Sequence, residues 1–548
     1  MATVDNQRSM NEAHDRDPYN NNSYGTLVDR PYVDVELPVL DVHDFNERVV
    51  RCYEEGVGEK ELAADLSVAR SLVPVGTATL RDFSYVSPDI PEYIPENCTG
   101  CMDCVTECPD TAILGKVLAE PDLEKKMNEI EDPDDRAMFA KQWSTTRKYY
   151  DGPKKKGKDG GRFAIIIDPS KCKGCAECVT VCDDLALKMI HKSEPVMDKI
   201  RKSHRYFKQM GPSDESYINE NLLIDMMLKE QSHIYVGGAG SCAGCGEGTA
   251  LRMMCAATGA KYKNQWGIVA ATGCNTVYTS TYPYNPYLVP WTNSLFENAP
   301  ADAMGVRMRW NQMGWNDRPL WCIGGDGAMF DIGFQSLSRL LASGLNVKVF
   351  VLDTQVYSNT GGQASTSTYT GQNTKMSFHG KVYGGKQERR KEIAQIAMMH
   401  PRTYVAQTTA AHTNHFYKAV LGALEFDGPA LVNCYTTCQP EHGVGDHMAG
   451  EQARLAVDSR AFPLLVFDPR KGDRLKQRLS LQGNPAVKEE WYKNPKTGET
   501  VDFVEFARSE GRFSKHFDAE GNPSETLLRA KQDRLENWQL LQELAGVI

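Results

Sequence analysis

The feature that most constrains this chain is a cysteine run that occurs twice with the same spacing. Both runs read C-x2-C-x2-C-x3-C, and their members are Cys98, Cys101, Cys104 and Cys108, then Cys172, Cys175, Cys178 and Cys182. One short wrapping loop can deliver three such thiolates to a single iron cube, whereas the fourth ligand must come from elsewhere. The spacing therefore predicts two [4Fe–4S] clusters and a chain that folds around them.

The fourth cysteine of each run is expected to cross to the other cluster, which ties the two halves of the module together. One predicted cluster is held by Cys98, Cys101, Cys104 and Cys182, and the other by Cys172, Cys175, Cys178 and Cys108. Structural zinc and disulfides are the alternatives, but zinc sites usually pair two C-x2-C elements and have no use for this spacing. Pro109 follows the first run, whereas Asp183 follows the second. The pattern favours a ferredoxin-like α+β module that transfers electrons.

From about residue 235 the pattern changes to alternating strands and helices. Residues 319–325 predict a buried strand that ends in a glycine turn, and residues 346–354 predict the next parallel strand. Residues 331–344 between them predict a helix whose apolar face and C-cap are Phe334, Leu337, Leu340, Leu341 and Gly344. A right-handed strand–helix–strand unit of this kind places ligands at the carboxyl ends of its strands. The second half of the chain is therefore expected to be an α/β domain with a parallel sheet.

Polar groups follow both predicted strands where they end. Gly325, Asp326 and Gly327 follow the first strand, and Thr354 ends the second. A lone Gly-Asp-Gly is a weak signal, since turns favour these residues, but two adjacent strand ends bring a carboxylate and a hydroxyl together. Mg²⁺ prefers such oxygen ligands and completes its octahedron with phosphates, which the glycines allow to approach closely. Thiamine-diphosphate enzymes share this layout, normally with asparagine where Thr354 stands.

A third set of cysteines is scattered along the α/β half. Cys242 and Cys245 form a C-x2-C pair, Cys274 follows, and Cys434 and Cys438 come last. Scattered ligands imply a pocket that the fold itself builds. Spacing alone does not decide between a cluster, a redox dithiol and half a zinc site, nor between Cys434 and Cys438.

The combination of motifs resembles the C-terminal half of the pyruvate:ferredoxin oxidoreductase family. The similarity covers about residues 70–480 and rests on GSCAGCGE, ATGCNTVY, PWTNSLFENA, GGDGAMFDIGF and DTQVYSNTGGQ downstream of the two cysteine runs. The resemblance implies a third [4Fe–4S] cluster, next to thiamine diphosphate, held by Cys242, Cys245, Cys274 and Cys438. It also implies that Asp326, Thr354 and the Val356 carbonyl hold Mg²⁺.

The resemblance further implies roles for residues around the cofactor. Glu247 would contact the aminopyrimidine and Asn359 would face the substrate, and these two are the expected catalytic residues. Cys274, Gly325, Gly327 and Ala328 complete the expected cofactor-binding set. Ala328 replaces the aromatic residue that the family carries after Gly-Asp-Gly, and Thr366 replaces a lysine. These two changes touch the pocket and leave the exact 2-oxoacid open.

The resemblance implies reversible oxidative decarboxylation of pyruvate to acetyl-CoA and CO2, with coenzyme A as cosubstrate and electrons passed through three [4Fe–4S] clusters to ferredoxin or flavodoxin. The activating glutamate, the arginine and threonine that bind the 2-oxoacid, and the coenzyme A domain would come from an obligate second subunit that carries the N-terminal half. Oxidation of 2-oxoglutarate or a branched-chain 2-oxoacid is the alternative, although Asn359 favours pyruvate. The alternative to an enzyme is a ferredoxin-type subunit that transfers electrons and has no catalytic activity of its own.

Composition and size agree with this interpretation. A chain of 548 residues is too long for a single hydrophobic core, and its length predicts about three domains. The net charge of −10 argues against a nucleic-acid or anionic-membrane surface, and no apolar stretch approaches the roughly 20 residues that span a bilayer. The start of the chain lacks the apolar region of a secretory signal. Because most of the 16 cysteines are assigned to clusters, we expect a reducing cytoplasm.

The expected organisation follows from these patterns. Residues 31–40 contain a β-like run and residues 46–72 a helical pattern, and the last predicted helix spans residues 524–548. The expected domains are a disordered tail (1–25), an N-terminal linker or extension (26–95), the ferredoxin-like domain (96–190), a linker (191–234), the thiamine-diphosphate-binding domain with its proximal cluster (235–455) and a C-terminal extension (456–548).

Overall fold

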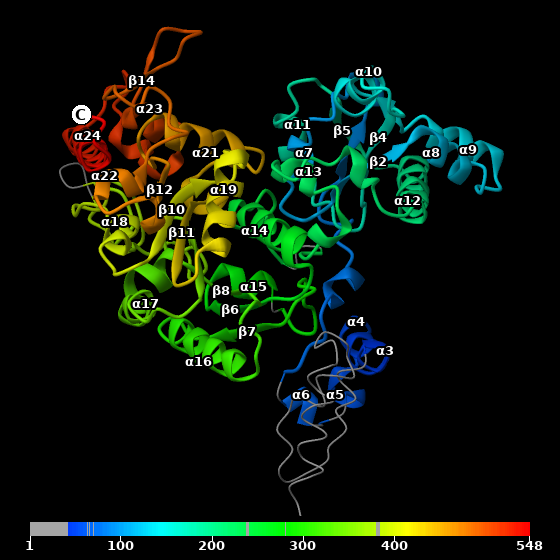
Figure 1. Cartoon of the computed structure of the whole chain (residues 1–548), viewed down its shortest axis with the longest axis horizontal. Coiled ribbons are helices and arrows are strands. Elements are labelled where there is room, and N and C mark those ends of the chain that lie inside the picture. Colours follow the sequence, from blue (N-terminus) through cyan, green and yellow to red (C-terminus); the bar gives the residue numbers. More distant parts are fainter. Residues whose placement is uncertain are drawn as a thin grey trace, which may run out of the picture.

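The computed structural model of the chain describes residues 42–62, 64, 66–69, 71–236, 240–279, 281–379 and 384–548. The predicted disorder of residues 1–25 and the β-like run at 31–40 lie outside the described residues. Figure 1 shows an α/β body formed by the chain after residue 240, a second lobe formed by residues 89–236, and a small group of helices before residue 70. None of the helices that the structure describes is long and apolar enough to cross a membrane.

The α/β body is built on one eight-stranded sheet with the order β13-β12-β10-β11-β9-β8-β6-β7. Its strands are β6 (Gly267–Ala271), β7 (Trp291–Ser294), β8 (Leu320–Gly325), β9 (Lys348–Asp353), β10 (Tyr404–Thr409), β11 (Ala430–Tyr435), β12 (Leu465–Phe467) and β13 (Leu479–Ser480). The strands from β10 to β7 run parallel, and only β12 and β13 pair antiparallel. Every residue of β9 and β11 is buried, as expected for central parallel strands with both faces covered.

Helices cover both faces of this sheet. Phe350 and Leu352 of β9 belong to a core shared with α14 and α19, whereas Val349 and Val351 belong to a second core with α17, α18 and α24. This alternation follows from the two-residue period of a strand. The helices of the body are α14 (Gly246–Tyr262), α15 (Cys274–Thr279), α16 (Ala299–Gln312), α17 (Phe334–Leu341), α18 (Ile393–Met398), α19 (Thr413–Glu425), α20 (Gln439–His442), α21 (Ala449–Asp458), α22 (Leu475–Arg478), α23 (Phe503–Arg508) and α24 (Glu525–Ala545).

The predicted strand–helix–strand unit is present as β8, α17 and β9. The two strands are parallel neighbours, with Gly325 opposite Leu352, so their carboxyl ends lie side by side. The helix starts later than expected, because a π-helical segment, η8 (Gly327–Ile332), precedes α17. Gly333 separates the two: a Cβ at this position would lie 2.5 Å from the Phe296 carbonyl oxygen, so only glycine permits this approach.

The second lobe contains both cysteine runs. Its elements are β1 (Asp89–Tyr93), α7 (Asp103–Thr106), β2 (Ile113–Ala119), α8 (Glu120–Met127), α9 (Pro133–Ala140), β3 (Ser144–Thr145), η5 (Arg147–Asp151), α10 (Gly152–Lys155), β4 (Gly161–Ile167), α11 (Glu177–Thr180), β5 (Leu187–His191), α12 (Glu194–Gln209) and α13 (Leu223–Met226). β1 pairs antiparallel with β5, and a three-stranded sheet has the order β2-β4-β3. The residues expected to link the domains, 191–234, include α12, and its Phe207 packs with Phe139 and Ile166 in one core.

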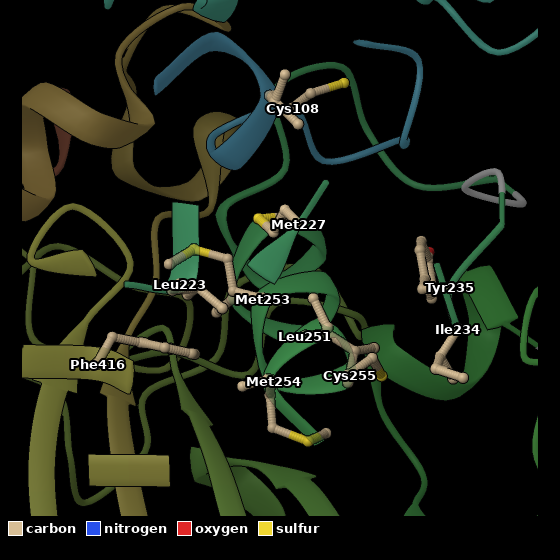
Figure 2. Packing of buried hydrophobic residues seen from close by; sticks show 14 of the residues in the cluster. Cys108, Leu223, Met227, Ile234, Tyr235, Leu251, Met253, Met254, Cys255 and Phe416 are labelled. Atoms are coloured by element: carbon tan, nitrogen blue, oxygen red, sulfur yellow. The ribbon is translucent and has the colours of Figure 1, made fainter. Parts of the chain in front are cut away.

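Helix α14 joins the two lobes. Figure 2 shows Leu251, Met253, Met254 and Cys255 of this helix among buried side chains that come from both lobes, including Leu223, Met227 and Phe416. All four α14 side chains are fully buried. Residues 246–259 of the helix are all buried, as expected for a helix packed on every side. Its first residues, Gly246 and Glu247, belong to the candidate site.

Further short elements lie toward the two ends of the described chain. They are α3 (Val42–Phe45), η2 (Asn46–Val50), α4 (Arg51–Glu54), α5 (Gly58–Glu61), α6 (Leu66–Ala69) and η3 (Thr77–Leu80), followed far along the chain by β14 (Tyr492–Lys493), β15 (Thr500–Val501) and η10 (Gly511–His516). The final predicted helix is present as α24, and its Trp538 and Leu541 pack against the sheet core.

Candidate functional site

The carboxyl ends of β8 and β9 bring together the residues predicted to hold a metal ion. Asp326 directly follows β8, and Thr354 directly follows β9. The Thr354 hydroxyl oxygen lies 3.0 Å from Asp326 Oδ1 and 3.0 Å from the Val356 carbonyl oxygen. All three residues are buried.

This spacing suits a magnesium ion. Mg–O distances of about 2.0–2.1 Å in an octahedron put neighbouring ligand oxygens about 3 Å apart, which is the separation found here. The second carboxylate oxygen, Asp326 Oδ2, accepts hydrogen bonds from the hydroxyls of Ser365 and Ser367. Burial, followed by the charge of Asp353, raises the pKa of Asp326 to about 7, and the hydroxyl hydrogen bonds oppose that shift. A bound dication would offset the cost of burying the ionised carboxylate.

Two cavities adjoin at this point. The first is lined by Gly325, Asp326, Gly327, Ala328, Val356, Phe296 and Tyr357, and the second by Cys242, Cys245, Cys438, Val277 and Tyr278. Glu247, Cys274, Thr354, Ser358 and Asn359 line both. A ligand anchored at the Gly-Asp-Gly turn can therefore extend directly to the cysteines.

Glu247 is a buried carboxyl group between the two cavities. It lies in the first turn of α14 and is only 5% exposed. Burial, followed by the charge of Asp326, raises the pKa of Glu247 to about 8, and the nearby Tyr278 hydroxyl opposes the shift. Its Oε2 atom has no hydrogen-bond partner among the described residues. A buried polar atom of this kind normally finds a partner, so the position suits a ligand that hydrogen bonds to it.

The scattered cysteines are gathered in the second cavity. Cys242 and Cys245 precede α14, Cys274 begins α15, and Cys438 precedes α20. Cys434 lies instead within β11, where it is fully buried and does not line the cavity. Burial raises the pKa of Cys438 to about 11, and that of Cys245 and Cys274 further. Deprotonated thiolates would be costly here without positively charged iron beside them.

Cysteines of the two runs also lie close to one another. One cavity is lined by Cys98, Cys101, Cys104 and Cys182, together with the apolar residues Met102, Phe163, Ile165 and Leu187. Cys108 lies instead close to the second run. Burial raises the pKa of Cys172, Cys175 and Cys178, and the nearby charge of Cys108 raises it further. All 16 cysteines are free thiols.

Both runs have the same backbone geometry. Gly100 and Met102 have positive φ angles of 76° and 74°, and Gly174 and Ala176 repeat them with 70° and 67°. Met102 and Ala176 are in a conformation that costs energy for non-glycine residues and persists only where the surroundings impose it. The two runs therefore share one loop conformation. Among the described residues, no group of three or more His, Cys, Asp and Glu side chains is placed to share one metal ion.

Polar contacts connect the second lobe to the third cysteine set. The Arg252 guanidinium of α14 donates to the Cys108 carbonyl at 3.0 Å, and the Thr249 hydroxyl donates to the Glu107 carbonyl at 3.2 Å. Lys173 forms a buried ion pair with Asp110 at 2.8 Å and donates to the Ser241 carbonyl. Residues beside Cys108 and Cys172 therefore contact the loop of Cys242 and the first turns of α14.

Several residues of the site had no recognisable signal in the sequence. Ser365 and Ser367 reach Asp326 from a loop about 40 residues later, and Arg390 forms a buried ion pair with Asp353. Serines in a loop and a single arginine are too common to be selected from one sequence. A carboxylate at the end of a buried strand, such as Asp353, could have been noticed.

Comparisons with known proteins agree with this geometry. Residues 271–434 match the family described as "Thiamine pyrophosphate enzyme, C-terminal TPP binding domain". The "Probable pyruvate-flavodoxin oxidoreductase" of Escherichia coli strain K12 is 28% identical over 519 residues, which cover 81% of this chain and 41% of that protein. The "Pyruvate:ferredoxin oxidoreductase" of Moorella thermoacetica is 27% identical, covering 87% of this chain and 44% of that protein. The chain thus spans less than half the length of these two relatives.

A shorter relative is matched over most of its length. The "Pyruvate synthase subunit PorB" of Pyrococcus horikoshii is 34% identical over 290 residues, which cover 51% of this chain and 86% of that subunit. The match to the thiamine-binding domain lies within the α/β body, where β8 and β9 carry Asp326 and Thr354. The chain therefore belongs to the family of pyruvate:ferredoxin and pyruvate:flavodoxin oxidoreductases.

Proposed function

We propose that this chain is the thiamine-binding and cluster-binding subunit of a pyruvate:ferredoxin oxidoreductase. The reaction is the reversible conversion of pyruvate and coenzyme A to acetyl-CoA and CO2, with electrons passed to ferredoxin or flavodoxin. The observation that carries the proposal is the pair of adjoining cavities that share Glu247, Cys274 and Asn359. One cavity contains the diphosphate-binding turn and the other the third cysteine set, so the cofactor and an electron acceptor are neighbours.

The chain's own residues would hold and orient the cofactor. Bound thiamine diphosphate supplies a carbon nucleophile and then accepts the electrons left by departing CO2. Asp326, Thr354 and the Val356 carbonyl would hold the Mg²⁺ that binds the diphosphate, and Gly325 and Gly327 let the backbone approach it. The Glu247 carboxyl would hydrogen bond to the aminopyrimidine, and Asn359 would orient the substrate.

The order of the cysteine sets suggests a route for electrons. Oxidation of pyruvate to acetyl-CoA and CO2 releases two electrons, whereas a ferredoxin accepts one at a time. Cys242, Cys245, Cys274 and Cys438 line the cavity that adjoins the proposed cofactor site, and residues beside Cys108 contact the loop of Cys242 and α14. We therefore propose three [4Fe–4S] clusters in series, with the ligands predicted from the sequence. A purely electron-transferring subunit would have no use for the Asp326–Thr354 pair.

A second subunit would complete the catalytic site. Exposed apolar side chains lie near the two cavities: Leu295, Ile332 and Val277 are 56%, 49% and 49% exposed. Val277 lines a cavity, Leu295 precedes the cavity-lining Phe296, and Ile332 ends η8. Exposed apolar groups beside an open site are typical of an obligate interface. The partner would supply the activating glutamate, the substrate-binding arginine and the coenzyme A site.

Pyruvate is the proposed substrate. Asn359 is exposed at the mouth of both cavities, where it can hydrogen bond to a small 2-oxoacid. 2-Oxoglutarate and branched-chain 2-oxoacids remain the alternatives, because Ala328 and Thr366 alter the family pattern. We expect the enzyme to work in a reducing compartment such as the cytoplasm, since its free thiols must bind iron.

The test is anaerobic purification of the chain with the polypeptides that accompany it, followed by assays of viologen reduction with coenzyme A. Pyruvate is expected to give the highest kcat/KM in a panel with 2-oxoglutarate and 2-oxoisovalerate. A higher value for another 2-oxoacid would overturn the substrate. If no 2-oxoacid reduces the dye while dithionite-reduced clusters pass electrons to ferredoxin, the chain is an electron-transfer subunit only.

A further inference from the structure

A residue in a strained backbone conformation separates two proposed metal ligands. Gln355 lies between Thr354 and Val356 and has a φ angle of 56°, which is in the left-handed region. Non-glycine residues rarely adopt this conformation unless their surroundings impose it. The turn at Gln355 brings the Thr354 hydroxyl and the Val356 carbonyl to the same side, 3.0 Å apart. The geometry of the metal site therefore depends on Gln355 staying in this conformation.

Every polar group of Gln355 has a partner. Its backbone N–H donates to Asp353 Oδ1 at 3.2 Å, and its carbonyl accepts from the Thr368 hydroxyl at 2.7 Å and from Gln372 Nε2 at 3.0 Å. Its side-chain amide donates to the Asp353 carbonyl. The side-chain oxygen accepts two hydrogen bonds from the guanidinium of Arg512, each 3.2 Å long.

Arg512 reaches this loop from the C-terminal part of the chain. It belongs to η10, lies 157 residues after Gln355 and has a fully buried side chain. Its Nε donates to Glu510 Oε2 at 2.6 Å, and Glu510 in turn accepts from the Tyr435 hydroxyl at 3.1 Å. The guanidinium is thereby held in one orientation, with two N–H groups directed at Gln355. A lysine could not form this two-pronged contact.

A second contact from the same network reaches the preceding residue. His442 Nε2 lies 2.8 Å from the Thr354 carbonyl oxygen and donates to it, because that oxygen can only accept. The His442 ring is fully buried, and its Nδ1 has no hydrogen-bond partner among the described residues. Thr354 and Gln355 are thus held by hydrogen bonds from His442 and Arg512.

We infer that Arg512, oriented by Glu510, is a positioning residue that holds the metal-binding loop in its strained conformation. The inference rests on the proposed function, because the loop is a metal site only if Asp326, Thr354 and Val356 bind Mg²⁺. It gives the segment after residue 500, which lies outside the matched thiamine-binding domain, a role in cofactor affinity. Arg512 itself touches neither metal nor substrate.

Single substitution of Arg512 would leave the Glu510 carboxylate buried without its counter-ion, which alone can unfold a protein. The test therefore uses the double variant E510Q/R512M, which removes both charges and keeps similar side-chain volumes. R460M is the matched control. Arg460 is also a fully buried arginine, but it donates to the carbonyls of Pro485 and Ala486 and stacks on Trp538, with no contact to the loop.

The measurement is Mn²⁺ binding by electron paramagnetic resonance at saturating thiamine diphosphate, on anaerobically purified enzyme stripped of cofactor by a chelator. E510Q/R512M is expected to raise the half-saturating Mn²⁺ concentration at least tenfold, with unchanged iron content, whereas R460M leaves it unchanged. Adding Q355G to the double variant should restore part of the affinity, because glycine adopts the left-handed conformation without strain.

The outcomes separate the inference from the function on which it rests. Equal Mn²⁺ affinity in the wild type and E510Q/R512M would overturn the role of Arg512. A loss of affinity that R460M shares would assign Arg512 only a general part in stability. Failure of the wild type itself to bind Mn²⁺ with thiamine diphosphate would instead overturn the metal site and the proposed function.

Discussion

Asp326 is the single anionic group among the proposed magnesium ligands, so it should dominate metal affinity. Asp326→Asn keeps the shape and replaces a charged oxygen with a neutral amide oxygen. We expect magnesium and thiamine diphosphate affinity to fall at least tenfold, about 1.4 kcal/mol, while the iron content stays the same. Asp331→Asn is the control, since Asp331 contacts Tyr357 and Thr366 outside the metal site. Equal thiamine retention in the two variants would refute the metal-site assignment.

Cys434 and Cys438 offer a second comparison at the residue scale, because they are four positions apart and only Cys438 lines the cavity with Cys242, Cys245 and Cys274. Three cubanes contain about twelve irons. Cys438→Ser is expected to reduce the iron content to about eight, whereas Cys434→Ser should leave about twelve. Iron and acid-labile sulfide analysis after anaerobic purification decides between Cys438 and Cys434 as the fourth ligand. A loss of iron in Cys434→Ser but not in Cys438→Ser would show that Cys438 is not that ligand.

Lys348 in β9 makes the stability of the body depend on pH. Its side-chain nitrogen donates to the Gly428 carbonyl at 2.9 Å and to the Phe426 carbonyl. Burial lowers the pKa of Lys348 to about 7. The unfolded chain, with a lysine pKa near 10.4, takes up the proton first as the pH falls, so stability is lost between about pH 10 and pH 7. Lys348→Met should abolish this loss, on the order of a few kcal/mol. The measurement is the free energy of unfolding in urea at pH 7 and pH 9.5 for both proteins. An equal change in this free energy between the two pH values in the wild type and Lys348→Met would contradict the prediction.

At the scale of elements, helix α21 of the body contacts the second lobe through its first turn. Glu177 accepts hydrogen bonds from the backbone N–H groups of Ala449 and Gly450, at 3.1 and 2.8 Å, and Arg454 forms an ion pair with Glu107 at 2.8 Å. The carboxylate of Glu177 thus satisfies N–H groups that a helix start leaves free. The two lobes are joined by this contact as well as by α14.

Gly450→Ala tests that contact. A Cβ at Gly450 would lie 1.9 Å from Glu107 Oε2, so the helix or the carboxylate must move, and we expect a loss of about 1–3 kcal/mol in the free energy of unfolding. Gly305→Ala in α16 is the matched control: nothing lies within 4 Å of its Cβ, and alanine should stabilise that helix by about 0.5–1 kcal/mol. If both variants gain stability in denaturant titrations, the two lobes do not depend on this contact.

At the scale of the whole molecule, the exposed apolar residues beside the cofactor cavities should belong to a subunit interface. Leu295→Asp places a charge in that surface, and we expect the affinity for the partner chain to fall at least tenfold, about 1.4 kcal/mol. Met399→Asp is the control, because Met399 is 63% exposed at the end of α18. Size-exclusion chromatography with light scattering measures the assembly, and an intact complex with Leu295→Asp would argue against an interface at this face.

Much of the fold follows from local sequence. The strands that became β8 and β9 and the helix α24 were predicted correctly, because each depends on a periodicity within a few dozen residues. The break between η8 and α17 was not predicted. It depends on the close approach of Gly333 to the Phe296 carbonyl, and the hydrophobic periodicity of the segment does not predict this contact.

The thiamine site divides in the same way. The Gly-Asp-Gly turn and Thr354 could be selected from residue types and spacing, since two adjacent parallel strands end there. Spacing left the role of the C-x2-C pair open. The family resemblance already favoured Cys438 over Cys434. Tertiary packing alone decides that Ser365 and Ser367 reach Asp326 and that Arg512 holds Gln355. Such contacts join segments far apart in the chain, and the entropy lost in closing those loops is recovered only when the whole core packs. No short stretch of sequence encodes that outcome.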